Sequence, residues 1–163
     1  SHLYSIPTTG LRFFTVYGPY GRPDMAYFKF TEAILNGAPI DVFNHGKQKR
    51  DFTYIDDIVE GVIKLIKNIP ELRQHNMTNA LAPFTLYNIG NNKPVSLDYF
   101  IELIEKLCGK KAIKKYLPMQ PGDVLETYAN IDPLIGDIGF EPKTTIEEGL
   151  SKFIKWYLSY NKR

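Results

Sequence analysis

Cysteine is nearly absent from this sequence, which excludes a fold held together by disulfides. Cys108 is the only cysteine among the 163 residues, so no disulfide can form within the chain. It ends an apolar helical pattern beside Gly109, which favours a small buried hydrophobe over a reactive thiol. Long apolar runs and a signal peptide are missing too, because no stretch approaches the roughly 20 residues of a membrane-spanning helix. We therefore expect a cytoplasmic protein without a membrane partner.

An excess of charge of one sign is also lacking. The chain carries 20 Lys and Arg against 18 Asp and Glu, a formal net charge of +2. This balance excludes a strongly electrostatic mode of action but permits a local basic site. The basic run Lys47–Arg50 is short and has no nucleic-acid-binding motif around it, so we expect no nucleic-acid partner.

Several constellations that carry chemistry are missing. The three histidines are scattered, and none has the spacing of a metal ligand pair, so no metal site is expected. Dinucleotide binding needs a glycine-rich turn between a strand and a helix. Gly18-x-x-Gly21 comes closest, but Asp24 stands where a third glycine would be. No tyrosine is followed four residues later by lysine, so we expect no catalytic residue in this stretch.

The patterns that are present predict one mixed α/β unit with short strands. Its length and apolar content suffice for a real core. The predicted strands, rich in β-branched and aromatic residues, are Leu11–Tyr17, Ile40–Phe43, Asp51–Tyr54, Phe84–Ile89 and Ile113–Leu117. The predicted helices begin or lie at Asp24 (ending at Gly37), Asp56, Ser96 (ending at Gly109), Pro133–Ile138 and Thr145.

Apolar spacing also predicts which helix faces are buried. The helix that begins near Asp56 is predicted to bury the stripe Ile55, Val59, Val62, Ile63 and Ile66. The last helix opens on the capping box Thr145-x-x-Glu148 and is predicted to bury Ile146, Leu150, Phe153, Ile154 and Tyr157. The stretch Ile69–Pro83 has no periodicity and is predicted to be a loop. The chain starts without Met, from which we expect a fragment, a cleaved product or a shortened chain.

Cations in loops are the strongest sign of a ligand. Arg22 follows a buried strand in a Gly/Pro loop, and Lys29 lies about two turns further on. Several cations at strand ends would suit a diphosphate, because Arg forks match phosphate oxygens. Asp123, in a Pro-Gly-Asp loop, could accept hydrogen bonds from ribose or a base. Lys47 and Lys49 could instead be solvated surface charges that bind no ligand. Arg50 could instead form a structural ion pair.

Five ordered motifs resemble the NAD-dependent epimerase/dehydratase family of extended short-chain dehydrogenase/reductases. The resemblance covers essentially the whole chain. The Arg-Pro-Asp-Met loop narrows the resemblance towards the UDP-uronate 4-epimerases. The five motifs are Leu11–Pro19, Arg22–Met25, Arg50–Asp57, Asn88–Asn91 and Leu117–Val124.

The resemblance implies the C-terminal part of an extended Rossmann-type fold: the last strands of the parallel sheet plus a small mixed α/β substrate-binding domain. Residues 1–163 would form a single nucleotide-sugar-binding portion, without the N-terminal Rossmann part that holds most of the NAD site and the catalytic Tyr and Lys. The parent enzyme would interconvert UDP-glucuronate and UDP-galacturonate at C4 during surface polysaccharide synthesis. This chain alone would bind the UDP-sugar weakly and be inactive.

Family roles carry over, by resemblance, only to binding residues. Lys29 departs from relatives that hold the uronate carboxylate with Arg, and Gln120 stands where many galactose-epimerase-type relatives carry Arg. The implied cofactor-side residues are Phe14 and Tyr17. The implied substrate-binding residues are Thr15 and Lys29 for the sugar, Arg22 for sugar and diphosphate, Asp41 and Phe43 for uracil, Arg50 for the diphosphate, and Asp123 for the ribose.

Two other interpretations stay open. The parent could be a neutral-sugar epimerase or a dehydratase of the same superfamily. Alternatively, the chain could be a non-catalytic remnant or binding module, associating as a homodimer or otherwise through the apolar strand Leu11–Val16, because an unpaired strand edge invites pairing.

Overall fold

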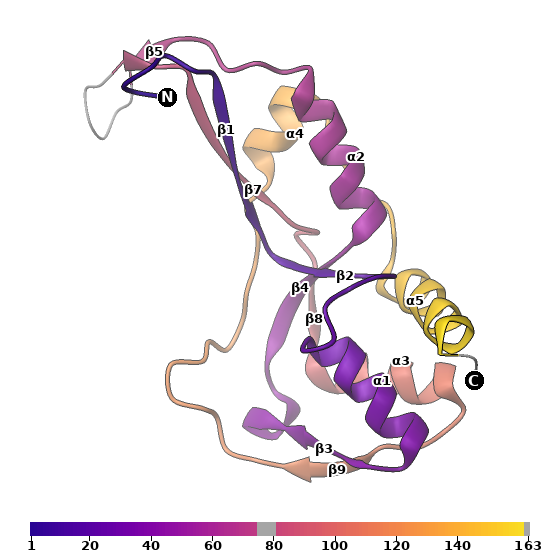
Figure 1. The fold of residues 1–163 in the computed structure, drawn as a ribbon. Helices are drawn as coiled ribbons and strands as arrows, with labels where there is room; N and C mark the ends of the chain where they lie inside the picture. The colour runs from indigo at the N-terminus through magenta and orange to yellow at the C-terminus, as the bar shows by residue number, and fades with distance from the viewer. Residues whose placement is uncertain (75–80, 162–163) are drawn as a thin grey trace.

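Short strands and helices alternate along the chain in a computed structural model, which describes residues 1–74 and 81–161 (Figure 1). The strands are β1 (Thr8–Phe13), β2 (Thr15–Tyr17), β3 (Pro39–Val42), β4 (Lys49–Tyr54), β5 (Arg73–Gln74), β6 (Leu81–Ala82), β7 (Phe84–Ile89), β8 (Pro94–Ser96) and β9 (Ile113–Tyr116). The helices are α1 (Ala26–Asn36), the 3₁₀ helix η1 (Phe43–Gly46), α2 (Ile55–Ile66), α3 (Leu97–Cys108), α4 (Asp132–Ile138) and α5 (Ile146–Tyr160).

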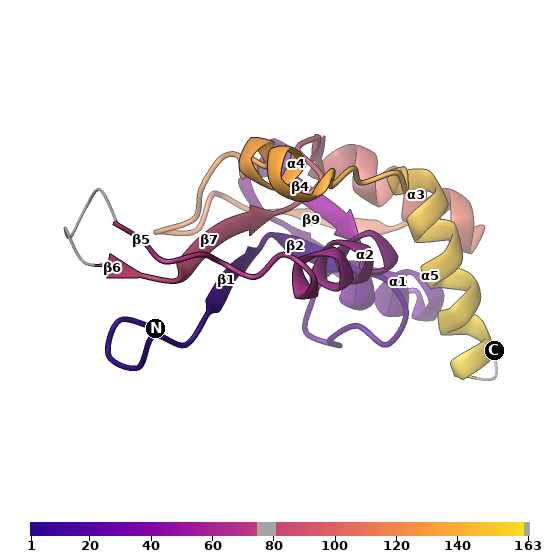
Figure 2. The ribbon, with the colours of Figure 1, turned by 90° about the horizontal axis from the view of Figure 1, so that it is seen from above.

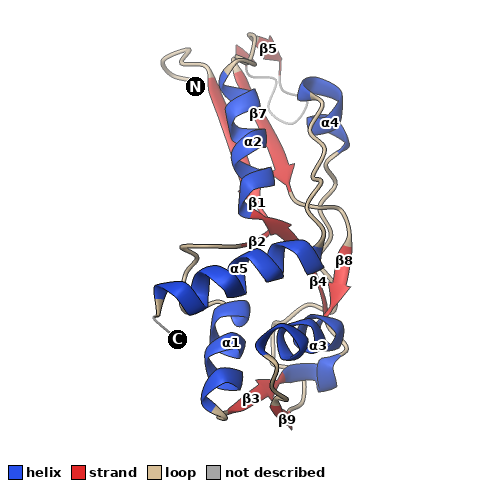
Figure 3. Ribbon diagram, turned by 90° about the vertical axis from the view of Figure 1, so that its right-hand side faces the viewer, coloured by secondary structure: helices blue, strands red, loops and turns tan. Residues whose placement is uncertain are grey.

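The elements gather into two lobes. At one end β1 and β7 pair in parallel beside α2 and α4, and we call these four elements the strand-pair lobe (Figure 1). At the other end β3 and β9 pair in parallel below α1, α3 and α5, which form the helical lobe (Figure 3). The three-stranded sheet β2–β4–β8 joins the lobes. Seen from above, β5 and α5 lie at opposite ends of the molecule (Figure 2). The predicted α/β class is therefore confirmed.

The strand predicted over Leu11–Tyr17 is divided at Phe14. Before this residue the chain pairs with β7, and after it the chain pairs with β4. The backbone N–H of Phe14 donates to the carbonyl of Ile89 at 3.1 Å, the last contact with β7 before β2 begins. Local sequence correctly predicts extended backbone here, but it carries no information about this change of partner.

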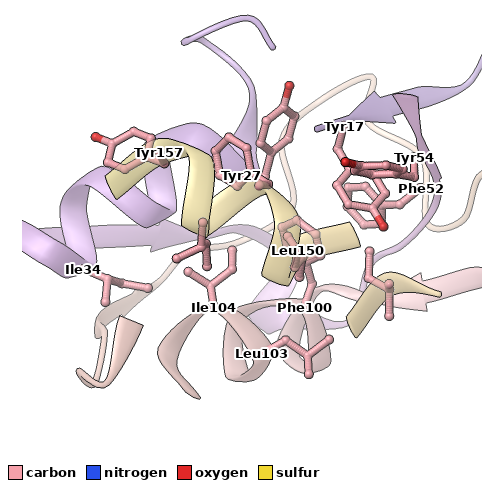
Figure 4. Packing of buried hydrophobic residues seen from close by; sticks show 13 residues of the cluster. Tyr17, Tyr27, Ile34, Phe52, Tyr54, Phe100, Leu103, Ile104, Leu150 and Tyr157 are labelled. Atoms are coloured by element: carbon pink, nitrogen blue, oxygen red, sulfur yellow. The ribbon is translucent and has the colours of Figure 1, made fainter. Parts of the chain in front are cut away.

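Aromatic side chains fill the core of the helical lobe (Figure 4). Phe52 and Phe100 stack at 4.3 Å between ring centroids. Tyr17 meets Phe52 and Tyr54 edge to face at 6.1 and 5.7 Å, a favoured arrangement for aromatic pairs. The core therefore binds β2, β4, α1, α3 and α5 to one another. Its buried members are Tyr17, Tyr27, Ile34, Phe52, Tyr54, Phe100, Leu103, Ile104, Ile146, Leu150, Phe153, Ile154 and Tyr157.

Most helix boundaries follow the predicted capping signals. The Oγ of Ser96 accepts a hydrogen bond from Tyr99 N at 3.4 Å, and Thr145 accepts one from Glu148 N at 3.2 Å. Gly37 ends its helix in the left-handed conformation, as does Gly109. The five predicted inner residues of α5 are all buried, which confirms that face.

The cap predicted at Asp24 is wrong. Helix α1 starts two residues later, with Met25 at its cap position and no side-chain hydrogen bond to the first turn. The Asp24 carboxylate instead receives the guanidinium of Arg22. An ion pair with a nearby cation has replaced the capping contact.

The inner face predicted for α2 is wrong in part, because only Ile55 and Val62 of its five residues pack against the cores. Val59, Ile63 and Ile66 are 46%, 54% and 72% exposed, while Ile58 and Leu65 are buried. Two adjacent faces of this helix are apolar, so spacing alone could not decide which one meets β7 and α4. The other apolar face is open to solvent in this chain.

Two remaining expectations concern Cys108 and the loop after α2. Cys108 packs against the aromatic core, and burial raises the pKa of its thiol to about 11, so the interpretation as a small hydrophobe is confirmed. The loop predicted over Ile69–Pro83 includes the short antiparallel pair β5–β6, while residues 75–80 lie outside the described part.

The buried carboxylate of Asp51 connects β4 to two other segments. Asp51 is fully buried and accepts backbone hydrogen bonds from Asn91 at 2.9 Å, Asn92 at 3.1 Å and Ala129 at 2.9 Å. Its own backbone N–H donates to Thr127 Oγ1 at 3.1 Å. Three donors compensate the desolvated charge. Asp51 thereby holds the turn after β7 and the segment before α4 against β4.

Substituting Asp51 with Asn should therefore weaken the whole fold. An amide offers one acceptor oxygen and turns an NH₂ towards a backbone donor, so we expect a loss of about 3 kcal/mol in the free energy of unfolding. Urea denaturation measures this loss. Asp41→Asn is the matched control, because Asp41 is exposed, and it should change stability by less than about 0.5 kcal/mol. Equal effects of the two substitutions would contradict the role of Asp51.

Close packing makes a second, independent prediction at Gly149. A Cβ atom there would lie 2.1 Å from the hydroxyl oxygen of buried Tyr17. Gly149→Ala should therefore cost about 1–3 kcal/mol through overpacking. Gly136→Ala is the control in α4, where a Cβ meets no atom within 4 Å, and it should be neutral or stabilising. A Gly149→Ala variant as stable as wild type in thermal denaturation would show that the α5–β2 contact is loose.

Candidate functional site

Arg50 and Asp123 form an ion pair between β4 and the long β9–α4 connection. The distance from Arg50 Nη2 to Asp123 Oδ1 is 2.6 Å, and both side chains are about three-quarters buried. Arg50 Nη1 also donates to the carbonyls of Val124 at 2.8 Å and Lys49 at 2.9 Å. The pair joins two residues 73 positions apart, each named from sequence as a ligand contact. The ion pair considered for Arg50 is confirmed.

Backbone contacts hold this connection along β3, η1 and β4. Leu117 N donates to Val42 O at 3.0 Å and receives His45 N on its own carbonyl at 3.3 Å. Further along, Lys49 N donates to Leu125 O at 2.9 Å. The segment that carries Asp123 is therefore fixed at both ends, which presents a carboxylate and a guanidinium together beside the β3–η1 corner.

A separate cavity of about 480 Å³ lies beside the β2–α1 loop. Its wall combines apolar and aromatic groups with one cation, Arg22. Phe14 and Tyr17 also line it, so three of the predicted site residues share this cavity. The other lining residues are Phe13, Val16, Gly18, Pro19, Tyr20, Gly21, Met25, Tyr27 and Ile55.

Tyr17 and Phe14, the two residues expected on the cofactor side, differ in how accessible they are to a ligand. The Tyr17 ring is buried in the aromatic core, its hydroxyl donates to Thr145 O at 3.3 Å, and burial raises its pKa well above the usual value. Tyr17 is therefore a protonated core residue that touches the cavity only at its edge. Phe14 is half-buried and packs against the core of the strand-pair lobe. Its role towards a cofactor stays a prediction.

The remaining predicted residues are spread over the surface. Thr15 is half-buried in β2 opposite Phe52, and Lys29 is exposed on α1. Asp41 is exposed in β3, and Phe43 begins η1. Asp41 and Phe43 thus lie at the β3–η1 corner, which contacts the start of the β9–α4 connection. It does not bring Lys29 to the wall of the cavity. These roles also stay predictions.

Two polar residues beside the ion pair were not singled out from sequence. Gln48 is buried and donates its side-chain amide to Asp123, on the carboxylate oxygen that Arg50 leaves free. Asp51, next to Arg50, is the buried carboxylate described above. Gln48 lies before the predicted strand and Asp51 is its first residue. Both stand in a polar run, so the sequence did not mark either of them as buried.

The Gly18–Gly21 turn does not have its backbone free for the pyrophosphate of a dinucleotide. The N–H of Gly21 donates to Gly18 O at 3.3 Å, and a Cβ on Gly21 would lie 1.8 Å from the hydroxyl of Tyr27. This turn is therefore filled by the chain's own side chain. Among residues 1–74 and 81–161 there is also no group of three side chains that could hold a metal ion.

No helix in residues 1–74 and 81–161 combines the length and the apolar character that a membrane span needs.

Similarity to known proteins agrees with this arrangement. Protein CapI of Staphylococcus aureus is 56% identical over 169 residues, covering 100% of this chain and 51% of that protein. UDP-glucuronate 4-epimerase 1 of Arabidopsis thaliana is 45% identical, in an alignment that covers 98% of this chain and 38% of that protein. The chain thus spans about half, or less, of the length of these curated relatives.

Solved structures show the same fold. The UDP-glucuronic acid 4-epimerase of Bacillus cereus, in complex with UDP-glucuronic acid and NAD, matches 97% of this chain with a TM-score of 0.81 at 32% identity. The UDP-glucose 4-epimerase of Thermotoga maritima, with UDP-glucose, matches 98% with a TM-score of 0.81 at 26% identity. This chain covers 47% and 48% of those two structures.

The family described as the NAD dependent epimerase/dehydratase family matches residues 1–90. That span includes all the residues that line the 480 Å³ cavity, and Arg50, while the relatives extend the similarity over Asp123 and α5. With its fold and its sequence in agreement, this chain belongs to the NAD-dependent epimerase/dehydratase family.

Proposed function

We propose that this chain is the nucleotide-sugar-binding part of an NAD-dependent UDP-sugar 4-epimerase and that it is inactive alone. The observation that carries the proposal is the Arg50–Asp123 pair. The guanidinium fork of Arg50 suits the diphosphate, and the carboxylate of Asp123 on the β9–α4 connection suits ribose hydroxyls. The cavity with Arg22 on its wall would receive the sugar. Relatives and structures with bound UDP-sugars support this assignment.

The leading substrate is UDP-glucuronate, interconverted with UDP-galacturonate at C4. A cytoplasmic location and a role in surface polysaccharide synthesis belong to the same proposal. Several UDP-glucuronate 4-epimerases among the similar proteins, from Arabidopsis thaliana and Bacillus cereus, favour it. A UDP-glucose 4-epimerase with the same fold supports the second candidate, a neutral-sugar epimerase.

A dinucleotide-binding part is proposed to complete the enzyme, because this chain covers only about half of its relatives, among them a structure that holds NAD. NAD would supply the hydride chemistry there, next to the apolar wall that includes Phe14. Within the described residues β1 pairs only with β7, so its second edge is open. Parallel sheets need cover on both faces, and Phe13 and Leu86 on this pair are 54% and 43% exposed. This edge and the open apolar face of α2 would receive the added part.

UDP binding by the chain alone tests the proposal. Calorimetry should detect UDP, and Arg50→Ala should weaken its affinity about 10- to 100-fold through loss of charge-assisted hydrogen bonds. Arg50→Lys should recover only part of the affinity, because Lys lacks the bidentate fork.

Lys47→Ala is the matched control three residues away. Lys47 is exposed, so its removal should change the UDP affinity less than about twofold. Circular dichroism would verify that each variant is folded. Identical affinities in wild type and in a folded Arg50→Ala variant would refute the diphosphate role.

Lys29 tests the uronate assignment. Lys29→Ala should weaken binding of UDP-glucuronate about tenfold, while Lys29→Arg should retain it, because the ligand carboxylate needs a cation. Binding of UDP-glucose should stay unchanged in both variants. Equal losses for both sugars would exclude the carboxylate role and favour the neutral-sugar alternative.

A further inference from the structure

Tyr20, in the β2–α1 loop, has an unusual backbone conformation. Its φ is +58°, in the left-handed region that bulky side chains rarely adopt because Cβ crowds the backbone. Such a conformation persists only when surrounding contacts determine it. The exposed position of Tyr20, with 82% of the side chain accessible, excludes burial in the core as the cause.

The contacts that hold Tyr20 come from the last turns of α5. Its ring centroid lies 5.1 Å from that of Trp156 and 6.5 Å from that of Tyr160. Trp156 and Tyr160 stack on each other at 5.0 Å with an interplanar angle of 24°. Figure 3 shows the chain between β2 and α1 passing the C-terminal end of α5. We call these three side chains the aromatic clamp.

Trp156 connects the aromatic clamp to the core of the helical lobe. Trp156 meets Phe153 at 5.9 Å and Phe28 of α1 at 6.4 Å, so one end of the stack is anchored in the helical lobe. On its other side the loop packs tightly on α1, where Gly21 leaves no room for a Cβ beside Tyr27. The loop is therefore held between α1 and α5.

The next residue after this turn is Arg22. Tyr20, Gly21 and Arg22 all line the 480 Å³ cavity, so the conformation of the turn sets where the guanidinium lies. Among the described residues Asp24 pairs with Arg22, and both side chains are more than half exposed. Such an exposed pair contributes little order by itself. The backbone is held by the hydrogen bond from Met25 N to the carbonyl of Arg22 at 3.2 Å, and the ring contacts of Tyr20 add to it two residues earlier.

We propose that Tyr20, Trp156 and Tyr160 are positioning residues that fix the β2–α1 loop and so hold Arg22 at the mouth of the cavity. The clamp itself is a property of the free chain. Its consequence for ligand binding rests on the function proposed above. Trp156 and Tyr160 would act only through the loop, because neither lines the cavity, whereas Tyr20 lines it as well.

The first test uses the chain without ligand. Hydrogen exchange of the amides in residues 18–25 should accelerate roughly three- to tenfold in Tyr20→Ala and in Tyr160→Ala, because stacking against the neighbouring rings is lost. Amides in β4 and α3 should exchange as in wild type. Both substituted side chains are largely exposed, so these variants should fold.

Conservative variants distinguish ring contact from other effects. Tyr20→Phe and Tyr160→Phe keep the rings, and no hydrogen bond joins either hydroxyl to the described residues, so exchange should return to the wild-type rate. Trp156 is the only tryptophan, and its emission should shift to longer wavelength in Tyr20→Ala but not in Tyr20→Phe. Unchanged exchange in residues 18–25 of both alanine variants would overturn the proposal.

Calorimetry with UDP-glucuronate separates the clamp from the proposed function. We expect Tyr160→Ala, whose side chain does not line the cavity, to bind about three- to tenfold more weakly and Tyr160→Phe to bind like wild type. Faster exchange with unchanged affinity would overturn the role in holding Arg22 but leave the binding function intact. Absence of binding in wild type would refute the proposed function, and with it the consequence of the clamp for the ligand.

Discussion

One buried carboxylate ties three segments together where the two lobes meet. Asp51 lies at the centre of β4 and receives backbone donors from the turn after β7 and from the segment before α4. Because a desolvated charge is tolerated only while its donors stay in place, these three segments are coupled. Arg50 precedes Asp51 on the same strand, so the position of the guanidinium depends on the anchored carboxylate. Asp123 reaches Arg50 on a connection whose end is tied to β4 by Thr127.

The chain thus holds its polar cluster in place but leaves a strand edge and an apolar helix face uncovered within the described residues. Its polar cluster is satisfied internally, since Gln48 and Arg50 both engage Asp123. A diphosphate at Arg50 would exchange one oxyanion for another, which needs little rearrangement of charge. In contrast, β1 has an open edge, and Val59, Ile63 and Ile66 form an apolar face on α2 that nothing in the described residues covers. Substrate binding and assembly therefore use different surfaces of the same small fold.

Local chemistry was predictable from the sequence, and choice of partner was not. The caps at Ser96 and Thr145 and the stops at Gly37 and Gly109 depend on neighbouring residues, and all four were found where predicted. The break at Phe14 and the buried face of α2 depend on distant segments, so periodicity gave an undivided strand and a stripe that is wrong in part. For the site, the resemblance to a family supplied Arg50 and Asp123. Their direct contact and the role of Asp51 needed the fold, because the partners are 40 to 78 residues away along the chain.

The central claim is that this chain already holds its nucleotide site in the correct arrangement. Backbone NMR shifts of the isotopically labelled chain, recorded while UDP is added, test that claim most directly. The account predicts saturable shifts at Arg50, Val124 and the β3–η1 corner, with α4 and the β1 edge unaffected. Shifts spread over the open face of α2, or none at saturating UDP, would contradict it.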